Sequence, residues 1–145
     1  MRIAILTISD ACSRGERADT SGDAIASWVA ARNDQLAARV LVPDETIEIV
    51  RALTAWCDND EADLVVTTGG TGLTARDVTP EATLAVLERE APGIAERLRA
   101  VGAAATPHAA LSRGVAGTAS ICCAAKAIPM ATTSFISRRR AIVMS

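Results

Sequence analysis

The sequence predicts an α/β fold with a mainly parallel central sheet. Three short apolar segments, 2–8, 36–42 and 63–67, are rich in branched side chains and are typical of strands. A segment with helical spacing of apolar residues follows each of them. Strands that alternate with helices usually lie parallel in one sheet. The chain has 145 residues, the length of one domain, and we expect residues 1–145 to form a single unit.

Two amphipathic helices are expected in the first half of the chain. The first covers about residues 21–32, with Thr20 or Ser21 as its N-cap, and the second covers about residues 45–58. Apolar residues recur at helical spacing in both segments, and these residues include Trp28 and Trp56. We therefore expect both tryptophans to lie in the core.

The second half of the chain predicts two more helices. Thr79 is expected to cap the third, because the proline that follows it loses no hydrogen bond at the first helical position. A fourth helix is expected to end at about Gly102. A strand is possible at 121–125, and the rest of the chain shows neither a clear period nor a glycine.

Composition excludes several classes of protein. The formal net charge is −2, which gives no general reason to expect binding to nucleic acid or to a membrane. No apolar run has the roughly 20 residues of a membrane span. The four cysteines lack metal-binding spacing and no signal peptide is evident, so a cytoplasmic location is expected. All 17 acidic residues precede residue 97, so residues 97–145 carry only positive charges. This cationic segment either binds phosphates or is attracted to the acidic residues 1–96.

The segment from Thr67 to Gly72, sequence TTGGTG, directly follows the apolar segment 63–67. Glycines there leave backbone N–H groups bare, and the threonines add hydroxyls, so Thr68, Gly69, Gly70, Thr71 and Gly72 form a candidate anion cradle. The segment is neither a Walker P-loop nor a dinucleotide fingerprint. The alternative interpretation is a tight turn.

Two acidic residues follow predicted strands and are candidates for a metal site. Asp44 and Asp77 each come after the expected carboxyl end of a strand, where both carboxylates could reach one ligand. Two carboxylates and a polyphosphate are a usual Mg²⁺ environment. Asp10 and Ser13 lie in the loop after the first strand and are further candidates for ligand contact. The alternative for all four residues is ordinary turn or cap chemistry.

With these residues, the sequence resembles the MoaB/Mog family of molybdenum cofactor biosynthesis proteins. The resemblance extends over roughly residues 2–118. It is carried by a series of motifs that occur in the family's order: Thr7-Ile8-Ser9-Asp10, Asp19-Thr20-Ser21-Gly22, Val42-Pro43-Asp44-Glu45, Thr67-Thr68-Gly69-Gly70-Thr71-Gly72, Arg76-Asp77-Val78-Thr79-Pro80-Glu81-Ala82-Thr83, Pro92-Gly93 and Leu111-Ser112-Arg113.

The resemblance implies a three-layer α/β sandwich with helices on both faces of the sheet. It also implies a homotrimeric molybdopterin adenylyltransferase with Mg²⁺, ATP and molybdopterin as ligands, acting with other proteins of the pathway. Asp44 and Asp77 then correspond to the acids for metal handling and catalysis. The glycine loop corresponds to the phosphate and pterin cradle, and Ser112 lines the same pocket.

The sequence departs from this family near its C-terminus. Where relatives continue into an Asn-Leu-Pro-Gly-Ser-Pro type of turn, this chain has the residues 121–129, which contain no such turn. We therefore expect residues 120–145 to form an atypical tail that lacks one wall of the pocket. The alternative function is a non-catalytic molybdopterin carrier or assembly protein with the same fold.

Overall fold

The computed structural model describes residues 1–59, 61–120 and 139–144. In these residues one sheet runs in the order β2-β1-β3-β6-β5-β4. β2, β1, β3 and β6 run parallel to one another, and β5 is antiparallel to both of its neighbours, β6 and β4. The strands are β1 (Arg2–Ile8), β2 (Gln35–Val42), β3 (Leu64–Thr68), β4 (Arg89–Glu90), β5 (Ala116–Ser120) and β6 (Arg139–Met144).

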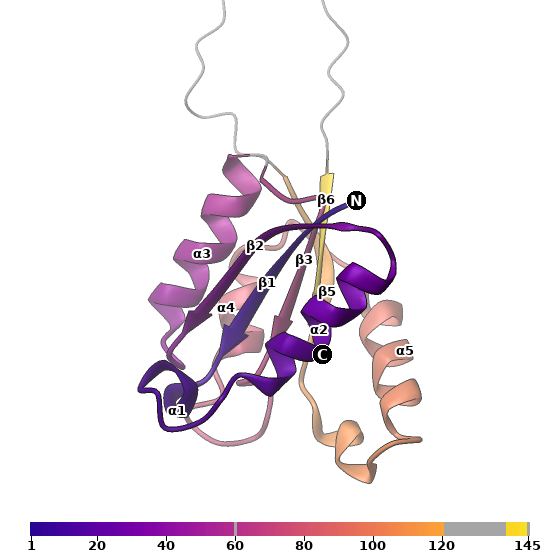
Figure 1. The fold of residues 1–145 in the computed structure, drawn as a ribbon. Helices are drawn as coiled ribbons and strands as arrows, with labels where there is room; N and C mark the ends of the chain where they lie inside the picture. Colours follow the sequence, from indigo (N-terminus) through magenta and orange to yellow (C-terminus); the bar gives the residue numbers. More distant parts are fainter. Residues whose placement is uncertain (60, 121–138, 145) are drawn as a thin grey trace, which may run out of the picture.

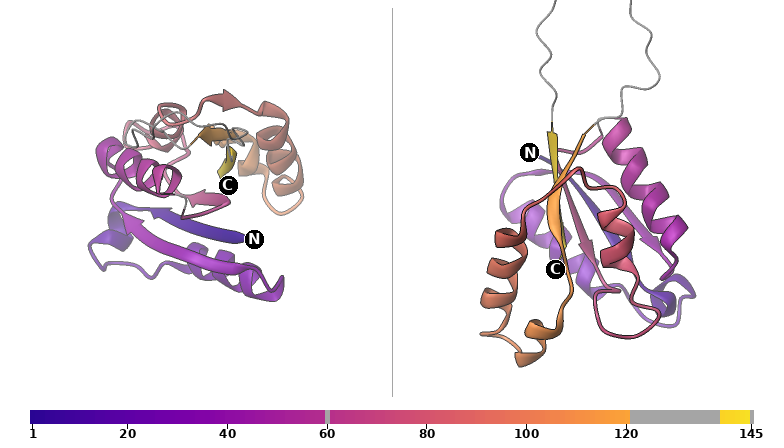
Figure 2. Two further views of the ribbon diagram at one scale, coloured as in Figure 1. Left: turned by 90° about the horizontal axis from the view of Figure 1, so that it is seen from above. Right: turned by 180° about the vertical axis from the view of Figure 1, so that it is seen from behind.

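Helices cover both faces of the sheet, as Figures 1 and 2 show. Helices α3 and α4 pack on one face, while α2 and α5 pack on the other. The predicted three-layer α/β architecture is therefore confirmed. The helices are α1 (Asp10–Ser13), α2 (Thr20–Ala31), α3 (Thr46–Asp58), α4 (Thr79–Leu84), α5 (Pro92–Gly102) and the 3₁₀ helix η1 (Pro107–Leu111).

Strand β1 is the centre of the core. Its residues from Ile3 to Ile8 are all buried, because β2 and β3 flank the strand and helices cover both of its faces. On α3, Ile49 and Leu53 are fully buried, and together with Trp56 they pack into the same apolar cluster. This nearly continuous apolar strand, interrupted only by Thr7 between Ile3 and Ile8, is typical of a parallel strand covered on both faces.

Three details of the helices differ from the sequence-based prediction. Trp28 was expected in the core, but it is 46% exposed on α2 and stacks beneath the guanidinium of Arg32. The N-cap of α2 is Asp19, whose carboxylate accepts from the Gly22 amide, and neither Thr20 nor Ser21 has this role. Thr79 is inside α4 and does not cap it, since Val78 precedes the first turn.

The strands of the second half were mostly missed. β5 consists of small residues without an apolar signal, and β4 has only two residues, so neither shows a strand pattern in the sequence. The strand predicted at 121–125 lies outside the described residues. β6 takes the position beside β3, with Val66 opposite Val143, in a segment that showed no period.

The parallel arrangement brings three loops to one edge of the sheet. β1, β2 and β3 end at Ile8, Val42 and Thr68, which lie at the same edge, at the bottom of Figure 1. Most of the candidate site residues lie in the segments that follow these strands, as the rule for open α/β sheets predicts, whereas Ser112 follows η1. None of the helices in the described residues is long and apolar enough to cross a membrane.

The different burial of the two tryptophans can be measured by fluorescence quenching. In a Trp56→Phe variant, the remaining emission comes from Trp28, and we expect acrylamide to quench it strongly. In a Trp28→Phe variant, the emission of Trp56, which is 5% exposed, should be blue-shifted and weakly quenched. Equal quenching constants in the two variants would contradict the position of α2.

Candidate functional site

The glycine loop leaves β3 with a backbone that only glycine tolerates. Gly69 and Gly70 have φ angles of 97° and 62°, in the left-handed region that side chains disfavour. A Cβ on Gly69 would collide with the carbonyl oxygen of Ile8, the last residue of β1. A Cβ on Gly70 would overlap the Thr79 hydroxyl and lie 2.8 Å from Asp44 Oδ1. The loop therefore passes directly over the ends of β1 and β2.

Asp10 and Asp44 hold each other's backbone. The Asp10 amide donates to Asp44 Oδ2 at 2.8 Å, and the Asp44 amide donates to Asp10 Oδ1 at 3.0 Å. These reciprocal bonds join the loop after β1 to the loop after β2. Hydrogen bonds to ionised carboxylates are among the stronger ones in proteins. Both carboxylates are thereby fixed at the same edge of the sheet.

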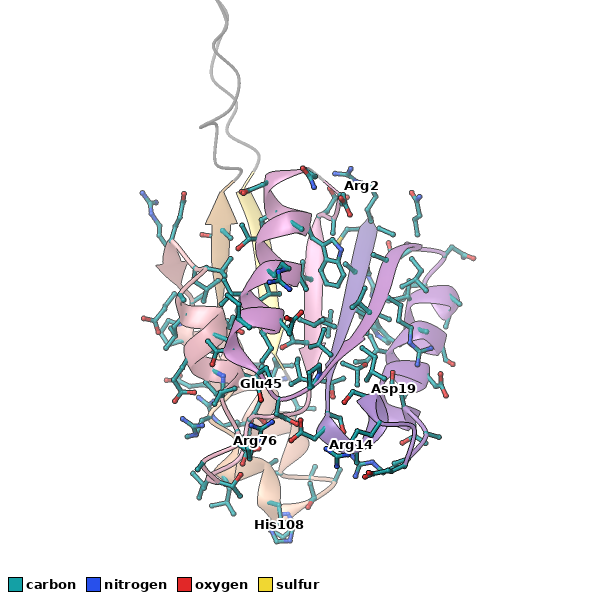
Figure 3. All side chains as sticks on the ribbon, turned by 90° about the vertical axis from the view of Figure 1, so that its left-hand side faces the viewer. Arg2, Arg14, Asp19, Glu45, Arg76 and His108 are labelled. Atoms are coloured by element: carbon teal, nitrogen blue, oxygen red, sulfur yellow. The ribbon has the colours of Figure 1, made fainter. Side chains whose placement is uncertain are left out.

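Arg76 joins the third loop to this pair. Its guanidinium makes a two-pronged contact with the Asp10 carboxylate at 2.9 to 3.1 Å and donates to Glu45 at 2.9 Å. Figure 3 shows Arg76 and Glu45 close together, at the end of the molecule opposite Arg2. The Asp44 amide, followed by the Arg76 guanidinium, lowers the pKa of Asp10, so this carboxylate is ionised at neutral pH.

Asp77 is held by its own loop. Its Oδ2 accepts from the Thr74 hydroxyl at 2.7 Å and from the Thr74 amide at 2.8 Å, and these two bonds lower the pKa of the carboxyl group. The same oxygen lies 2.8 Å from the position that a Cβ on Gly72 would take. Asp77 thus sits at the far end of the glycine loop, as an anion.

The segment after η1 supports the glycine loop from the side. The Ser112 hydroxyl donates to Thr71 Oγ1 at 3.2 Å, and the Arg113 amide donates to the Thr71 carbonyl at 2.9 Å. The Arg113 side chain donates to the carbonyl oxygens of Gly72 and Asp77. Sequence reasoning included this arginine in a motif but assigned no role to it, because its contacts span 36 and 41 residues.

The predicted site residues are therefore brought to one end of the molecule. Two of them, Thr68 and Ser13, have structural roles there. Thr68 is the last residue of β3 and is buried, so it anchors the loop. The Ser13 hydroxyl is exposed and donates to the carbonyl of Asp10 inside the short helix α1. Its contact is the turn chemistry that was the alternative interpretation for this residue.

The residues present suit a magnesium ion with few protein ligands. Among the described residues, no group of three or more His, Cys, Asp or Glu side chains is placed to bind a metal. Mg²⁺ usually keeps several waters and takes one or two carboxylates together with substrate phosphates. Asp44 Oδ1 points to Gly70 beside the Thr79 hydroxyl, which is buried and has no hydrogen-bond partner in the described part of the chain. This oxygen-rich donor set fits the ion.

Two hollows lie beside Arg113, whose side chain contacts the glycine loop. One of about 560 Å³ is open to solvent, and it is lined by Thr74, Asp77 and Arg113 among others. The other, of about 330 Å³, lies between α5 and the segment after η1, and its lining includes Ser112 and Arg113. Asp77 lines the first hollow and Ser112 lines the second. Arg113 lines both of them.

A family model described as "Probable molybdopterin binding domain" matches residues 4–136. The chain belongs to this family. The resemblance to MoaB/Mog proteins that the motifs indicated is thereby confirmed.

Relatives of this chain carry related names. It is 42% identical over 118 residues to "Molybdopterin adenylyltransferase" of Escherichia coli K12, a match that covers 79% of this chain and 60% of the relative. It is 41% identical over 117 residues to "Molybdenum cofactor synthesis protein cinnamon" of Drosophila melanogaster, covering 79% of this chain and 19% of the relative. The chain therefore spans less than two thirds of the length of both relatives.

A solved structure of the same family supports the fold. The crystal structure of the molybdopterin biosynthesis enzyme MoaB from Thermus thermophilus superposes with a TM-score of 0.74 and 53% identity. The match covers 80% of this chain and 73% of that structure. The three-layer arrangement of this chain is thus shared with a protein that is similar in sequence.

Replacement of Gly70 tests the packing of the loop. Gly70→Ala should lower the free energy of unfolding by about 1–2 kcal/mol from the left-handed backbone alone, with a further loss from overlap with Thr79. Gly93→Ala is the matched control, because its Cβ would meet nothing within 4 Å on α5. The control should be neutral or slightly stabilising in urea unfolding. Equal effects of the two substitutions would contradict the described loop.

The lowered pKa of Asp10 predicts how stability depends on pH. A carboxyl group with a lower pKa in the folded protein stabilises it above the unfolded-state pKa of about 4, and the effect is lost as the pH falls through the folded value. Asp10→Asn should therefore cost stability at pH 7, and the difference from wild type should shrink towards pH 3. Urea unfolding at several pH values measures it. A difference that does not change with pH would show that the charge has no role.

Proposed function

We propose that this protein is a molybdopterin adenylyltransferase of molybdenum cofactor biosynthesis. The observation that carries the proposal is the convergence of the glycine loop with Asp44 and Asp77 at the carboxyl edge of a parallel sheet. The names of relatives at about 40% identity, such as the Escherichia coli protein, support the same reaction. The substrates are molybdopterin and ATP.

The proposed reaction is the transfer of an adenylyl group. An oxygen of the terminal phosphate of molybdopterin forms a bond to the α-phosphorus of ATP. The bond between that phosphorus and the oxygen leading to the β-phosphate breaks, and pyrophosphate leaves with its electron pair. The products are adenylylated molybdopterin and pyrophosphate, so no redox partner is needed.

The residues of the chain act mainly by positioning. The glycine loop binds phosphoryl oxygens through backbone N–H groups, and the Thr71 and Ser112 hydroxyls, which contact each other, orient the ligand beside it. Asp44 and Asp77 would hold Mg²⁺, which, when bound, neutralises charge on the phosphates. Enzymes of phosphoryl chemistry act almost entirely by aligning the attacking and leaving oxygens and by stabilising charge electrostatically.

The setting of the reaction is proposed from the family resemblance. We expect a homotrimer in the cytoplasm that exchanges its substrate and product with other proteins of the pathway. Sizing of the purified protein by light scattering measures the subunit number. A monomer at working concentration would contradict this part of the proposal.

The decisive experiment follows pyrophosphate. Purified protein is incubated with molybdopterin, ATP and Mg²⁺, and pyrophosphate release is measured with a coupled assay. We expect turnover by wild type and a loss of at least about a hundredfold in Asp77→Asn, because the group that holds the metal and the loop is removed. Removal of Mg²⁺ with EDTA should also stop the reaction.

Asp34→Asn is the matched control for this loss. Asp34 pairs with the amino group of Met1, at the opposite end of the sheet, so this variant should keep full turnover. Wild-type protein that binds molybdopterin but releases no pyrophosphate would favour the non-catalytic carrier. Full turnover of Asp77→Asn would remove Asp77 from the mechanism.

A further inference from the structure

Arg113 contacts the glycine loop and the turn that follows it, although it lies more than 30 residues further along the chain. Its Nε donates to the Gly72 carbonyl at 2.7 Å, its Nη2 donates to the Asp77 carbonyl, and its Nη1 pairs with Glu81 on α4. Its own amide donates to the Thr71 carbonyl at 2.9 Å. One residue therefore contacts the glycine loop, Asp77 and the following helix.

The two carbonyl contacts bracket a turn that has few other supports. The residues between Gly72 and Asp77 are all exposed, and Leu73 is exposed to 69%. Inside the turn, Thr74 and Asp77 bond to each other, and the exposed Arg76 side chain ties the middle of the turn to Asp10 and Glu45. Arg113 supplies the attachment at both ends of the turn.

The three contacts differ in importance. The pair with Glu81 is half-exposed, and such an ion pair contributes little because water screens it. The two contacts with carbonyl oxygens are charge-assisted and lie in a part-buried position. The planar guanidinium presents its donors in a fixed fork, which the single ammonium group of a lysine cannot reproduce.

Arg113 is itself held in place from α5. Arg99 donates to the carbonyl oxygens of Ser112 and Gly114, the residues on either side of Arg113. The Ser112 hydroxyl also accepts from the Gly114 amide at 3.2 Å. The segment that carries Arg113 is thus fixed to a helix, and its guanidinium transmits that position to the turn.

We propose that Arg113 is a positioning residue that fixes the turn from Gly72 to Asp77 and thereby places the Asp77 carboxylate. The guanidinium donates to three protein acceptors, the carbonyls of Gly72 and Asp77 and the carboxylate of Glu81. Its role is therefore to hold the loop and not to bind the phosphates. The catalytic consequence rests on the proposed adenylyl transfer. The structural consequence does not depend on it.

The first test needs no substrate. Amide hydrogen exchange is measured over residues 72–78 in wild type, Arg113→Lys, Arg113→Gln and the control Arg51→Gln, whose arginine pairs with Glu48 on the surface of α3. Both Arg113 variants should exchange faster in this segment, on the order of tenfold, while the sheet stays protected. The control should match wild type. Exchange unchanged in both Arg113 variants would overturn the proposal.

The second test separates positioning from binding. With pyrophosphate release as readout, Arg113→Lys should lower kcat by about tenfold to a hundredfold and leave KM for ATP nearly unchanged, because Asp77 is misplaced while the loop amides remain. A raised KM with unchanged kcat would show that Arg113 binds substrate and would overturn the proposal. If wild type shows no turnover, the proposed function fails, and the exchange experiment still decides the role of Arg113.

Discussion

The reciprocal hydrogen bonds between Asp10 and Asp44 are the constraint on which the site depends. Each carboxylate accepts from the other residue's amide, so the loops after β1 and β2 fix each other. Arg76 then ties the third loop to the same pair through Asp10 and Glu45. The sheet brings the three loops to one edge, but these contacts decide the orientation of the carboxylates there. A parallel sheet alone would leave their side chains free to point into solvent.

Glycine supplies the second constraint, which is one of space. Gly69 lies against the carbonyl of Ile8, and Gly70 lies against the Thr79 hydroxyl and the Asp44 carboxylate. The loop can approach both strands this closely only because it carries no Cβ at these positions. The same close approach places the backbone of the loop beside two acids, an arrangement that suits a site for phosphate together with a metal ion. Packing and the proposed function therefore depend on the same glycines.

Sequence reasoning found those parts of the fold and site whose signals are local. β1 was predictable because every residue from Ile3 to Ile8 is apolar or small and buried, and the acids were predictable because they follow strands. β5 was missed because its small residues carry no apolar period, and Trp28 was misplaced because periodicity marks a helical stripe but not how much of it the neighbours cover. Arg113 could not be assigned, since its contacts join residues 36 and 41 positions apart.

The balance of charge at the site supports the need for a cation. The described loops place several carboxylates there, namely those of Asp10, Asp44, Glu45, Asp77 and Glu81. Two arginines at the site are already engaged, Arg76 by Asp10 and Glu45, and Arg113 by Glu81 and two carbonyl groups. A polyphosphate that entered alone would meet repulsion from the acids with little compensation. A divalent ion would remove that repulsion, so these charges support the proposal that the nucleotide enters as its metal complex.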